Sequence, residues 1–416
     1  MEKIKLAIVG CGGMGGRHLL GLKELQESGM GNVQLVAACD LRRDNAERLA
    51  DKAADLLGAR PAIFGAMTEM ARAVSDLDAV VVTSDSGSHH VVACQAFDLG
   101  LHVLCEKPLG ISMRACNRIL AAQARAGKTL SVAENYRRDP MARLTKALID
   151  AGAIGRPYLM FDLSASGKNE ILILPWRHYK HVGGMVIDGG VHNADLLLYF
   201  LGDVREVYAR TKLWETTRIQ GARIGVADFY EAWRSEIPQS ITATSEDMFV
   251  SVVGFESGAT ANWTQFYAGH GKGFGQKVVY GEKGALVCGG IRNGVSPVLT
   301  QDSGAELTGD ALLELAPDYH LDAITARLYG SPRPASFNLP FPACDRKLLA
   351  IEYYEFAQCI LTGRPPEVDG LMGRRALGVC YAGLESGVLG RPVKVDDVEA
   401  ERTAIYEADI NAHWGI

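Results

Sequence analysis

The segment at residues 4–27 most constrains the fold of this chain, because it combines a β-rich run, a glycine-rich turn and a helical pattern. Glycines at positions 10, 12 and 15 have the G-x-G-x-x-G spacing, and between a strand and a helix this spacing indicates a dinucleotide-binding loop. Gly10 permits the tight turn, Gly12 lets the backbone approach a pyrophosphate, and Gly15 lets helix and strand pack closely. The helix N-terminus then presents free N–H groups to the phosphates. The expected cofactor contacts of this loop are Gly10, Gly12, Gly13, Met14 and Gly15.

A second β-rich run, residues 33–39, ends at Asp40. A carboxylate there accepts hydrogen bonds from the adenosine ribose hydroxyls and repels a 2′-phosphate, which favours NAD. NADP stays open, because the neighbouring Arg42 and Arg43 can hold that phosphate. Asp40 has a second possible role as the cap of the helix that begins near residue 44. The expected adenosine contacts are Asp40, Leu41 and Arg42.

The alternation of strands and helices continues to residue 133. Further β-rich runs occupy 62–64, 78–83, 102–105 and 130–133, with helical patterns near 44–57, 88–99 and 112–126. Such alternation predicts a parallel sheet with right-handed crossovers. We expect residues 1–133 to form an α/β domain that binds NAD(P).

Beyond residue 134 the pattern changes to strands joined by short turns, as at 256–258 and 281–284. Such turns indicate antiparallel hairpins. We therefore expect residues 134–416 to form an α+β domain with a mainly antiparallel sheet. The segments 212–245 and 289–340 are polar and poorly periodic, and we interpret them as excursions that cover a substrate site or a subunit contact. The other runs are 159–165, 203–209, 248–255, 259–265 and 277–281, with helical patterns near 345–362 and 373–389.

Glu106-Lys107-Pro108 follows the run 102–105 directly. Ligands bind beyond the carboxyl ends of strands in an open parallel sheet, so Lys107 can reach a substrate there, with a pKa that the site can lower. A solvated turn lysine is the alternative reading. The Lys107–Pro108 bond is a candidate for the cis form.

The polar loop 83–90 follows the preceding strand and lies at the same edge of the sheet. Thr83 and Ser84 are expected to contact the nicotinamide ribose or the pyrophosphate, although the alternative is that Ser88 only caps the next helix. The expected cofactor contacts of these two loops are Thr83, Ser84, His89, Glu106 and Lys107.

An apolar helical pattern near residues 185–198 contains Asp188, His192 and Asp195 on one face. An Asp and a His on a buried helix need partners. A His with a carboxylate on one ring nitrogen can exchange a proton near neutral pH. A structural polar network is the alternative. We expect no metal site, because no second His or Cys cluster supports one.

The four residues at 176–179, Trp-Arg-His-Tyr, precede this helix, and they are interpreted either as pocket residues or as core and rim residues. Aromatic side chains can stack on a sugar face, while Arg and His can bind hydroxyl groups. We expect Trp176 and Arg177 to contact substrate.

Composition excludes some classes of partner. The formal net charge of −6 argues against nucleic-acid binding, and no apolar stretch is long enough to span a bilayer. None of the nine cysteines forms a C-x-x-C pair, which favours reduced packing thiols. The chain starts Met-Glu-Lys-Ile-Lys and enters a strand at once, which is expected to leave no room for a signal peptide. We expect a cytoplasmic protein.

Together these motifs resemble the Gfo/Idh/MocA family of oxidoreductases (glucose–fructose oxidoreductase, inositol dehydrogenase, rhizopine catabolism). The resemblance rests on the glycine loop, Glu106-Lys107-Pro108, Gly152–Pro157, Trp176-Arg177, Gly183-Gly184 with D-x-x-x-H, Glu246-Asp247, Gly363-Arg-Pro365 and Gly390-Arg-Pro-Val393. The last two look like the C-terminal helices of the family. The loop at 83–89 departs from the family pattern T-P-N-x-x-H, because it lacks the proline and has one more residue.

The resemblance implies an NAD(P)-dependent oxidoreductase with an N-terminal Rossmann domain and a second domain whose open sheet often mediates oligomerisation. A homodimer or homotetramer is therefore expected. Lys107 matches the active-site lysine of the family, and Asp188 and His192 match its catalytic pair.

The resulting hypothesis is reversible oxidation of a secondary alcohol on a sugar, cyclitol or related polyol. His192 removes the hydroxyl proton, Asp188 orients His192, and Lys107 hydrogen-bonds the reacting oxygen. One alternative is oxidation of a glycoside at a ring carbon with a tightly held, recycled NAD(H). A non-catalytic dinucleotide sensor is the other alternative, which the presence of all three residues disfavours.

Overall fold

The computed structural model describes residues 3–222 and 228–416. Its first sheet has six parallel strands in the order β3-β2-β1-β4-β5-β6. β1 and β4–β6 are almost wholly buried, which is why their sequences are near-continuous apolar runs. The elements are β1 (Ile4–Val9), α1 (Gly13–Glu27), β2 (Val33–Cys39), α2 (Arg43–Leu57), β3 (Ala62–Phe64), α3 (Met67–Ala73), β4 (Ala79–Val82), α4 (His89–Asp98), β5 (His102–Glu106), α5 (Met113–Ala126) and β6 (Leu130–Ala133). The expected parallel Rossmann sheet is confirmed, and α3 is an addition to it.

The first sheet takes one covering helix from far along the chain. Helix α10 (Phe341–Thr362) packs along α1, and its Leu348 and Phe356 share a core with Leu6 and Ile8 of β1. The domain boundary at residue 133 therefore stays a prediction, because a helix from beyond that boundary completes the core of the first sheet.

The second sheet has nine strands in the order β16-β15-β14-β13-β7-β12-β11-β8-β17. Only the β7–β12 pair is parallel among the described strands of this sheet, so a mainly antiparallel sheet is confirmed. The turns at 256–258 and 281–284 join antiparallel neighbours, as expected. The strands are β7 (Pro157–Gly167), β8 (Val204–Lys212), β11 (Met248–Phe255), β12 (Thr260–Gly269), β13 (Phe274–Gly281), β14 (Gly284–Val287), β15 (Val298–Gln301), β16 (Glu306–Thr308) and β17 (Val393–Lys394).

The two polar segments, residues 212–245 and 289–340, contribute different elements to the fold. Residues 289–340 add β15 and β16, which extend the sheet at its edge, and then α9 (Ala323–Tyr329). Edge strands are short and polar, which explains their weak signal in the sequence. Residues 212–245 contribute β9 (Thr217–Ile219), η3 (Asp228–Glu236) and β10 (Ser240–Thr242); positions 223–227 lie outside the described residues.

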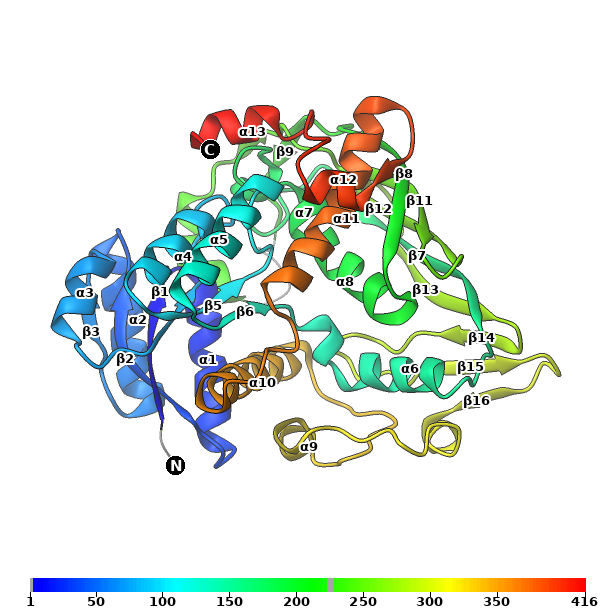
Figure 1. Ribbon diagram of the computed structural model, residues 1–416, viewed down its shortest axis with the longest axis horizontal. Helices are drawn as coiled ribbons and strands as arrows, with labels where there is room; N and C mark the ends of the chain where they lie inside the picture. The colour runs from blue at the N-terminus through cyan, green and yellow to red at the C-terminus, as the bar shows by residue number, and fades with distance from the viewer. Residues whose placement is uncertain (1–2, 223–227) are drawn as a thin grey trace.

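Helices α8 (Gly190–Leu201) and α11 (Gly370–Leu389) lie between the two sheets (Figure 1). α11 contacts β8, α8 and α5, and so joins the two halves of the molecule. Gly363 and Gly390 end α10 and α11 in the left-handed conformation. The two Gly-Arg-Pro motifs therefore mark the ends of helices, not helices themselves.

The last part of the chain returns to the first sheet. After β17 and α12 (Val395–Glu399), α13 (Ala408–Trp414) lies beside α4 and α5 (Figure 1). Among the residues that the structure describes, no helix is long and apolar enough to cross a membrane.

Candidate active site

A cavity of about 660 Å³ lies at the carboxyl ends of β1, β2 and β4. A Cβ at Gly10 would lie 2.5 Å from the Ser84 nitrogen, and one at Gly15 would lie 2.5 Å from the Gly10 oxygen. The space around Gly12, in contrast, is open to 4 Å. Tight packing beneath the loop and free space above it fit a dinucleotide pyrophosphate. The predicted residues that line this cavity are Gly10, Gly12, Gly13, Met14, Asp40, Leu41, Thr83 and Ser84.

Asp40 is held at the end of β2 by the backbone. Its two carboxylate oxygens accept hydrogen bonds from the Cys11 N–H (2.6 Å) and the Arg42 N–H (2.8 Å). The Arg42 side chain does not line the cavity, because its guanidinium pairs with Asp44 (3.1 Å) and Glu236 (2.8 Å). The expected contact of Arg42 with the cofactor therefore stays a prediction, and in this structure its guanidinium is paired with two carboxylates.

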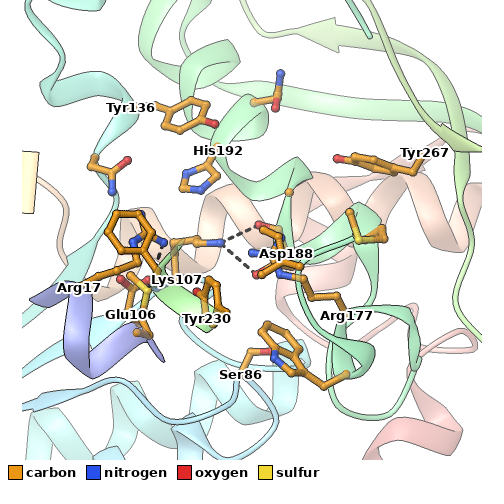
Figure 2. Close-up of a pocket in the computed structure, with 18 of the residues that line it drawn as sticks. Arg17, Ser86, Glu106, Lys107, Tyr136, Arg177, Asp188, His192, Tyr230 and Tyr267 are labelled. Carbon is orange, nitrogen blue, oxygen red and sulfur yellow. Dashed lines mark hydrogen bonds and ion pairs between the residues drawn. The ribbon is translucent and has the colours of Figure 1, made fainter. Parts of the chain in front are cut away.

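A second cavity of about 450 Å³ lies between the two sheets (Figure 2). It brings together residues that lie far apart in the sequence, from the ends of β5 and β6, from α7 (Met185–Asp188) and from α8. The predicted residues that line it are Met14, Ser84, His89, Glu106, Lys107, Trp176, Arg177, Asp188 and His192. The Lys107–Pro108 peptide bond is cis, as expected.

Lys107 is fixed by Asp188. Its ammonium group donates to the Asp188 carbonyl (2.9 Å) and carboxylate (3.0 Å), and Arg177 approaches the other carboxylate oxygen at 2.6 Å (Figure 2). Burial works to raise the pKa of Asp188, but Arg177 and Lys107 lower it to about 2. Asp188 is thus a permanent anion shared by two cations.

The partner of His192 is Glu134, which directly follows β6. The Nδ1–H group of His192 donates to both Glu134 oxygens, at 2.7 and 2.8 Å. The expectation that Asp188 orients His192 is therefore wrong in its choice of carboxylate. With Nδ1 as the donor, Nε2 keeps its lone pair. Burial and the nearby Lys107 lower the pKa of His192 well below 6.5, so the imidazole is neutral at neutral pH.

An aromatic stack supports His192. The Tyr136 ring lies parallel to the imidazole, with centroids 4.1 Å apart. The guanidinium of Arg292 lies over the Tyr136 ring at 5.2 Å, and it hydrogen-bonds Asn135 at 2.5 Å. This stack and the Glu134 hydrogen bonds fix the ring in one orientation.

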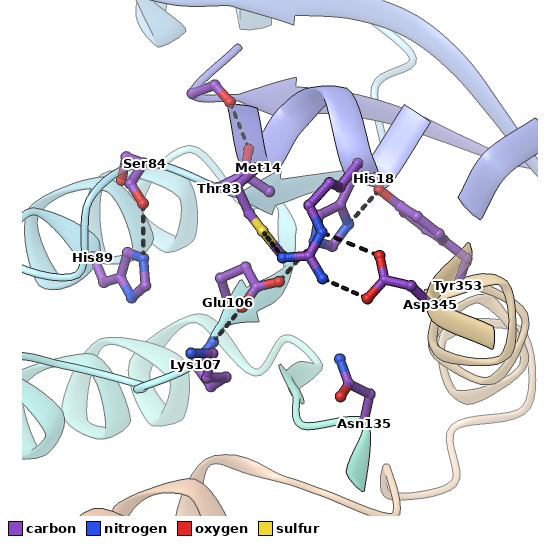
Figure 3. A network of polar contacts seen from close by, with 12 residues as sticks. Met14, His18, Thr83, Ser84, His89, Glu106, Lys107, Asn135, Asp345 and Tyr353 are labelled. Atoms are coloured by element: carbon purple, nitrogen blue, oxygen red, sulfur yellow. Dashed lines mark hydrogen bonds and ion pairs between the residues drawn. The ribbon is translucent and has the colours of Figure 1, made fainter. Parts of the chain in front are cut away.

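Glu106 belongs to a buried chain of polar groups next to Lys107 (Figure 3). Its carboxylate hydrogen-bonds His18 (2.9 Å), and His18 in turn bonds the Tyr353 hydroxyl (2.8 Å). The other Glu106 oxygen accepts from the Lys107 N–H at 3.0 Å. His89 acts similarly, because its Nδ1–H donates to the Pro108 carbonyl at 2.8 Å. Both side chains position the turn that carries Lys107.

Some predicted neighbours lie outside both cavities. Asp195 forms a buried ion pair with Arg137 (2.6 Å), which accounts for it without a role beside His192. His178 accepts a hydrogen bond from the Leu172 N–H, so it belongs to the supporting structure.

The sequence analysis missed Glu134, Tyr136, Tyr230 and Trp414. A signal for Glu134 exists, since it follows a buried parallel strand just as Lys107 does. No local pattern identifies Tyr230 or Trp414, which come from η3 and α13 to line the dinucleotide cavity.

Comparison with known proteins gives a consistent picture. Residues 4–134 match the family described as an oxidoreductase family with an NAD-binding Rossmann fold, and residues 142–287 match the GFO/IDH/MocA C-terminal domain.

Two curated relatives align over nearly the whole chain. The chain is 24% identical to D-apiose dehydrogenase of Paraburkholderia graminis over 99% of its length and 95% of the relative. It is also 24% identical to myo-inositol 2-dehydrogenase of Thermotoga maritima, over 95% of this chain and 99% of that protein. An oxidoreductase of Agrobacterium radiobacter, solved with NAD+, L-tartaric acid and magnesium, has the same fold, with a TM-score of 0.69, 20% identity, and coverage of 95% of this chain and 99% of that one.

Proposed function

This chain belongs to the NAD-binding Gfo/Idh/MocA family of oxidoreductases, and from that premise we propose that it oxidises a secondary alcohol of a sugar, cyclitol or related polyol. The observation that carries the proposal is that Lys107, Asp188 and His192 line one cavity. A sensor has no need of a buried lysine beside a neutral histidine. The named relatives act on a sugar and a cyclitol, in agreement with this class of substrate.

His192 is the proposed base. Its neutral Nε2 can accept the proton of a substrate hydroxyl, and Glu134 stabilises the imidazolium that results. Glu134 thereby takes the orienting role that the sequence suggested for Asp188.

Lys107 is proposed to donate a hydrogen bond to the reacting oxygen and to stabilise negative charge that develops on it. Asp188 directs the ammonium group, and Arg177 offsets part of the Asp188 charge. NAD, when bound, supplies the hydride acceptor.

The cavity offers groups suited to a polyhydroxylated substrate. Trp176 presents an aromatic face, while Asn193 and Gln265 present amides. Aromatic faces pack on the C–H surface of a sugar ring, and amides bind its hydroxyl groups. Trp176 and Arg177 are accordingly proposed as substrate contacts.

A substrate panel tests the proposal. Sugars, inositols and sugar acids are offered with NAD and with NADP, and NADH or NADPH fluorescence is followed. We expect steady turnover of at least one polyol.

In Lys107→Met, turnover should fall by about 10²-fold or more, while NADH affinity changes little. Lys23→Met serves as a control, because Lys23 pairs with Glu27 outside both cavities. Wild-type turnover in Lys107→Met would refute the role of Lys107.

One observation favours the alternative of a retained, recycled cofactor. η3 lies over the glycine loop, and a Cβ at Gly13 would lie 2.3 Å from the Tyr230 ring. Tyr230 lines both cavities, so it stands where a dinucleotide would enter. Nicotinamide absorbance that persists through purification would support this alternative, and a freely exchanging cofactor would exclude it.

A further inference from the structure

The loop between β4 and α4 is contacted by a residue more than 300 positions further along the chain, Trp414. Its indole lines the dinucleotide cavity together with Ser84 and Asp85 of that loop. The indole N–H donates to the His181 carbonyl at 2.6 Å, and the ring meets His90 edge-on, with centroids 5.5 Å apart. Trp414 therefore contacts the loop of the first sheet and a segment of the second half at once.

Gly87 provides the seat for this indole. A Cβ at position 87 would lie 2.3 Å from Cζ2 of Trp414, a distance that real Cβ contacts do not reach. Any side chain at position 87 would displace the ring. The segment in which this loop differs from the pattern T-P-N-x-x-H therefore contains Gly87, and the packing of Gly87 against Trp414 requires a glycine.

The helix that carries Trp414 is anchored on both sides. Toward the first sheet, Asn411 accepts from the Ser112 hydroxyl at 2.6 Å, and Glu407 accepts from the Met113 N–H at 2.9 Å. Toward the second half, Asp409 pairs with Lys180 at 2.9 Å. These contacts hold the indole at a fixed place in the wall of the cavity.

We propose that Trp414 is a cofactor-site residue, whose indole forms one wall of the dinucleotide cavity and positions the loop 83–90. The loop carries Ser84, which is expected to contact the nicotinamide ribose or the pyrophosphate. An aromatic side chain that packs on a bound nucleotide increases the affinity for that nucleotide. A loop that is already held in place keeps its polar atoms where they can contact the nucleotide, so less ordering is needed on binding. The inference rests on NAD binding and does not depend on which alcohol is oxidised.

NADH binding to Trp414→Ala and Trp414→Phe tests this proposal without any alcohol substrate. Dissociation constants are measured by fluorescence titration, and energy transfer from tryptophan to bound NADH is recorded in the same samples. We expect Trp414→Ala to weaken NADH binding about tenfold and to reduce the energy transfer. Trp414→Phe should reduce energy transfer equally but weaken binding less, because it keeps an aromatic face while it loses the bond to His181 and part of the contact with Gly87.

Trp214→Ala is the matched control, because Trp214 is 55% exposed and lines neither cavity. It should bind NADH like the wild type. Wild-type affinity and wild-type energy transfer in Trp414→Ala would overturn the proposal. If Trp414→Ala does not fold, the same two measurements on Trp414→Phe decide: unchanged energy transfer places the indole away from the cofactor. A failure to find an alcohol substrate leaves these outcomes unaffected, so the two proposals fail separately.

Discussion

At the scale of single residues, the site depends on two carboxylates with different tasks. Asp188 lies between Lys107 and Arg177, and Glu134 holds His192. The Asp188 carboxylate fixes the direction of the Lys107 ammonium group. The Glu134 carboxylate is hydrogen-bonded to Nδ1 of His192, and it thereby makes Nε2 a better base. In the proposed mechanism, the motif D-x-x-x-H therefore contains His192 but not the carboxylate that supports it as a base.

Glu134→Gln tests this division. The amide can still accept the Nδ1–H group, but it cannot stabilise an imidazolium with its charge. We expect kcat to fall by about 10- to 100-fold with unchanged NADH affinity, a smaller loss than the about 10²–10⁴-fold contribution of a complete acid–base group. Wild-type kcat in this variant would show that His192 works without Glu134.

The pH profile gives a second measurement on His192. Its pKa is lowered by burial, and the base must be neutral to act, so kcat/KM should stay level as the pH falls through 6.5 and decline only at lower pH. In Glu134→Gln the decline should move to still lower pH, because the protonated ring loses its counter-charge. A decline centred at 6.5 in the wild-type protein would contradict the neutral, buried base.

Cofactor selectivity is also a residue-scale property. Asp40 repels a 2′-phosphate, and Arg42 is occupied by Asp44 and Glu236. We expect the wild type to prefer NAD. Asp40→Asn combined with Glu236→Gln should raise the NADP-to-NAD ratio of kcat/KM by about tenfold or more, since one repulsion is removed and Arg42 loses one of its two anionic partners. Glu231→Gln, which alters the neighbouring Glu231–Arg234 pair of η3, should leave the ratio unchanged.

At the scale of elements, most of the fold could be predicted from the sequence. The six parallel strands lie within one or two residues of their predicted positions, because buried runs bounded by turns are local signals. The expected helix at 185–198 is instead α7 and α8, which meet at Gly189. A Cβ there would lie 2.4 Å from the Tyr267 hydroxyl, a constraint set by another strand. The site is similar: strand-end residues were visible locally, but the pairing of His192 with Glu134 depends on how the two sheets meet.

α13 and its flanking residues carry a pH-sensitive contact. Burial raises the pKa of Glu407 to about 8, with further contributions from Glu385 and Glu401. The folded protein therefore binds the Glu407 proton more tightly than the unfolded chain does. The contribution of this proton to stability is fully present below about pH 4.5, and it is lost progressively as the pH rises to about 8. Glu407→Gln should show a smaller fall in Tm between about pH 6 and about pH 9.

The control for this measurement is Asp409→Asn in α13, two residues after Glu407. The pKa of Asp409 is lowered in the fold, mainly by Lys180 against the opposing effect of burial, so Asp409 is charged throughout the range tested. Its substitution should leave the slope of Tm against pH unchanged. Equal slopes in the wild type and Glu407→Gln would exclude Glu407 as the titrating group.

At the scale of the whole molecule, the second sheet has one covered and one open face. α11 and α8 pack on the covered face, while Tyr208, Val250 and Val252 are exposed on the other. Val252 and Tyr208 are direct neighbours across β11 and β8, so they form a continuous apolar surface. A surface of this kind is a candidate for a protein–protein contact.

We expect the protein to be a homodimer or homotetramer through this face. Val252→Glu should lower the molar mass measured by light scattering, because a charge would be buried in the contact. Val295→Glu is the control, since Val295 is at least as exposed as Val252 but lies in the loop before β15. A monomeric wild type, or a dimer that Val252→Glu leaves intact, would contradict the proposed face.

The packing of α10 on α1 has a consequence for synthesis. All six strands of the dinucleotide-binding sheet have left the ribosome once residue 133 has emerged, but the helix that shares the core of β1 ends at residue 362. The apolar side chains that α10 covers in the folded protein are therefore exposed on the newly made first third of the chain while more than half of the chain is still being translated. A gene fragment that encodes residues 1–133 alone is expected to give an aggregation-prone product, whereas one that extends through residue 362 can supply the missing cover.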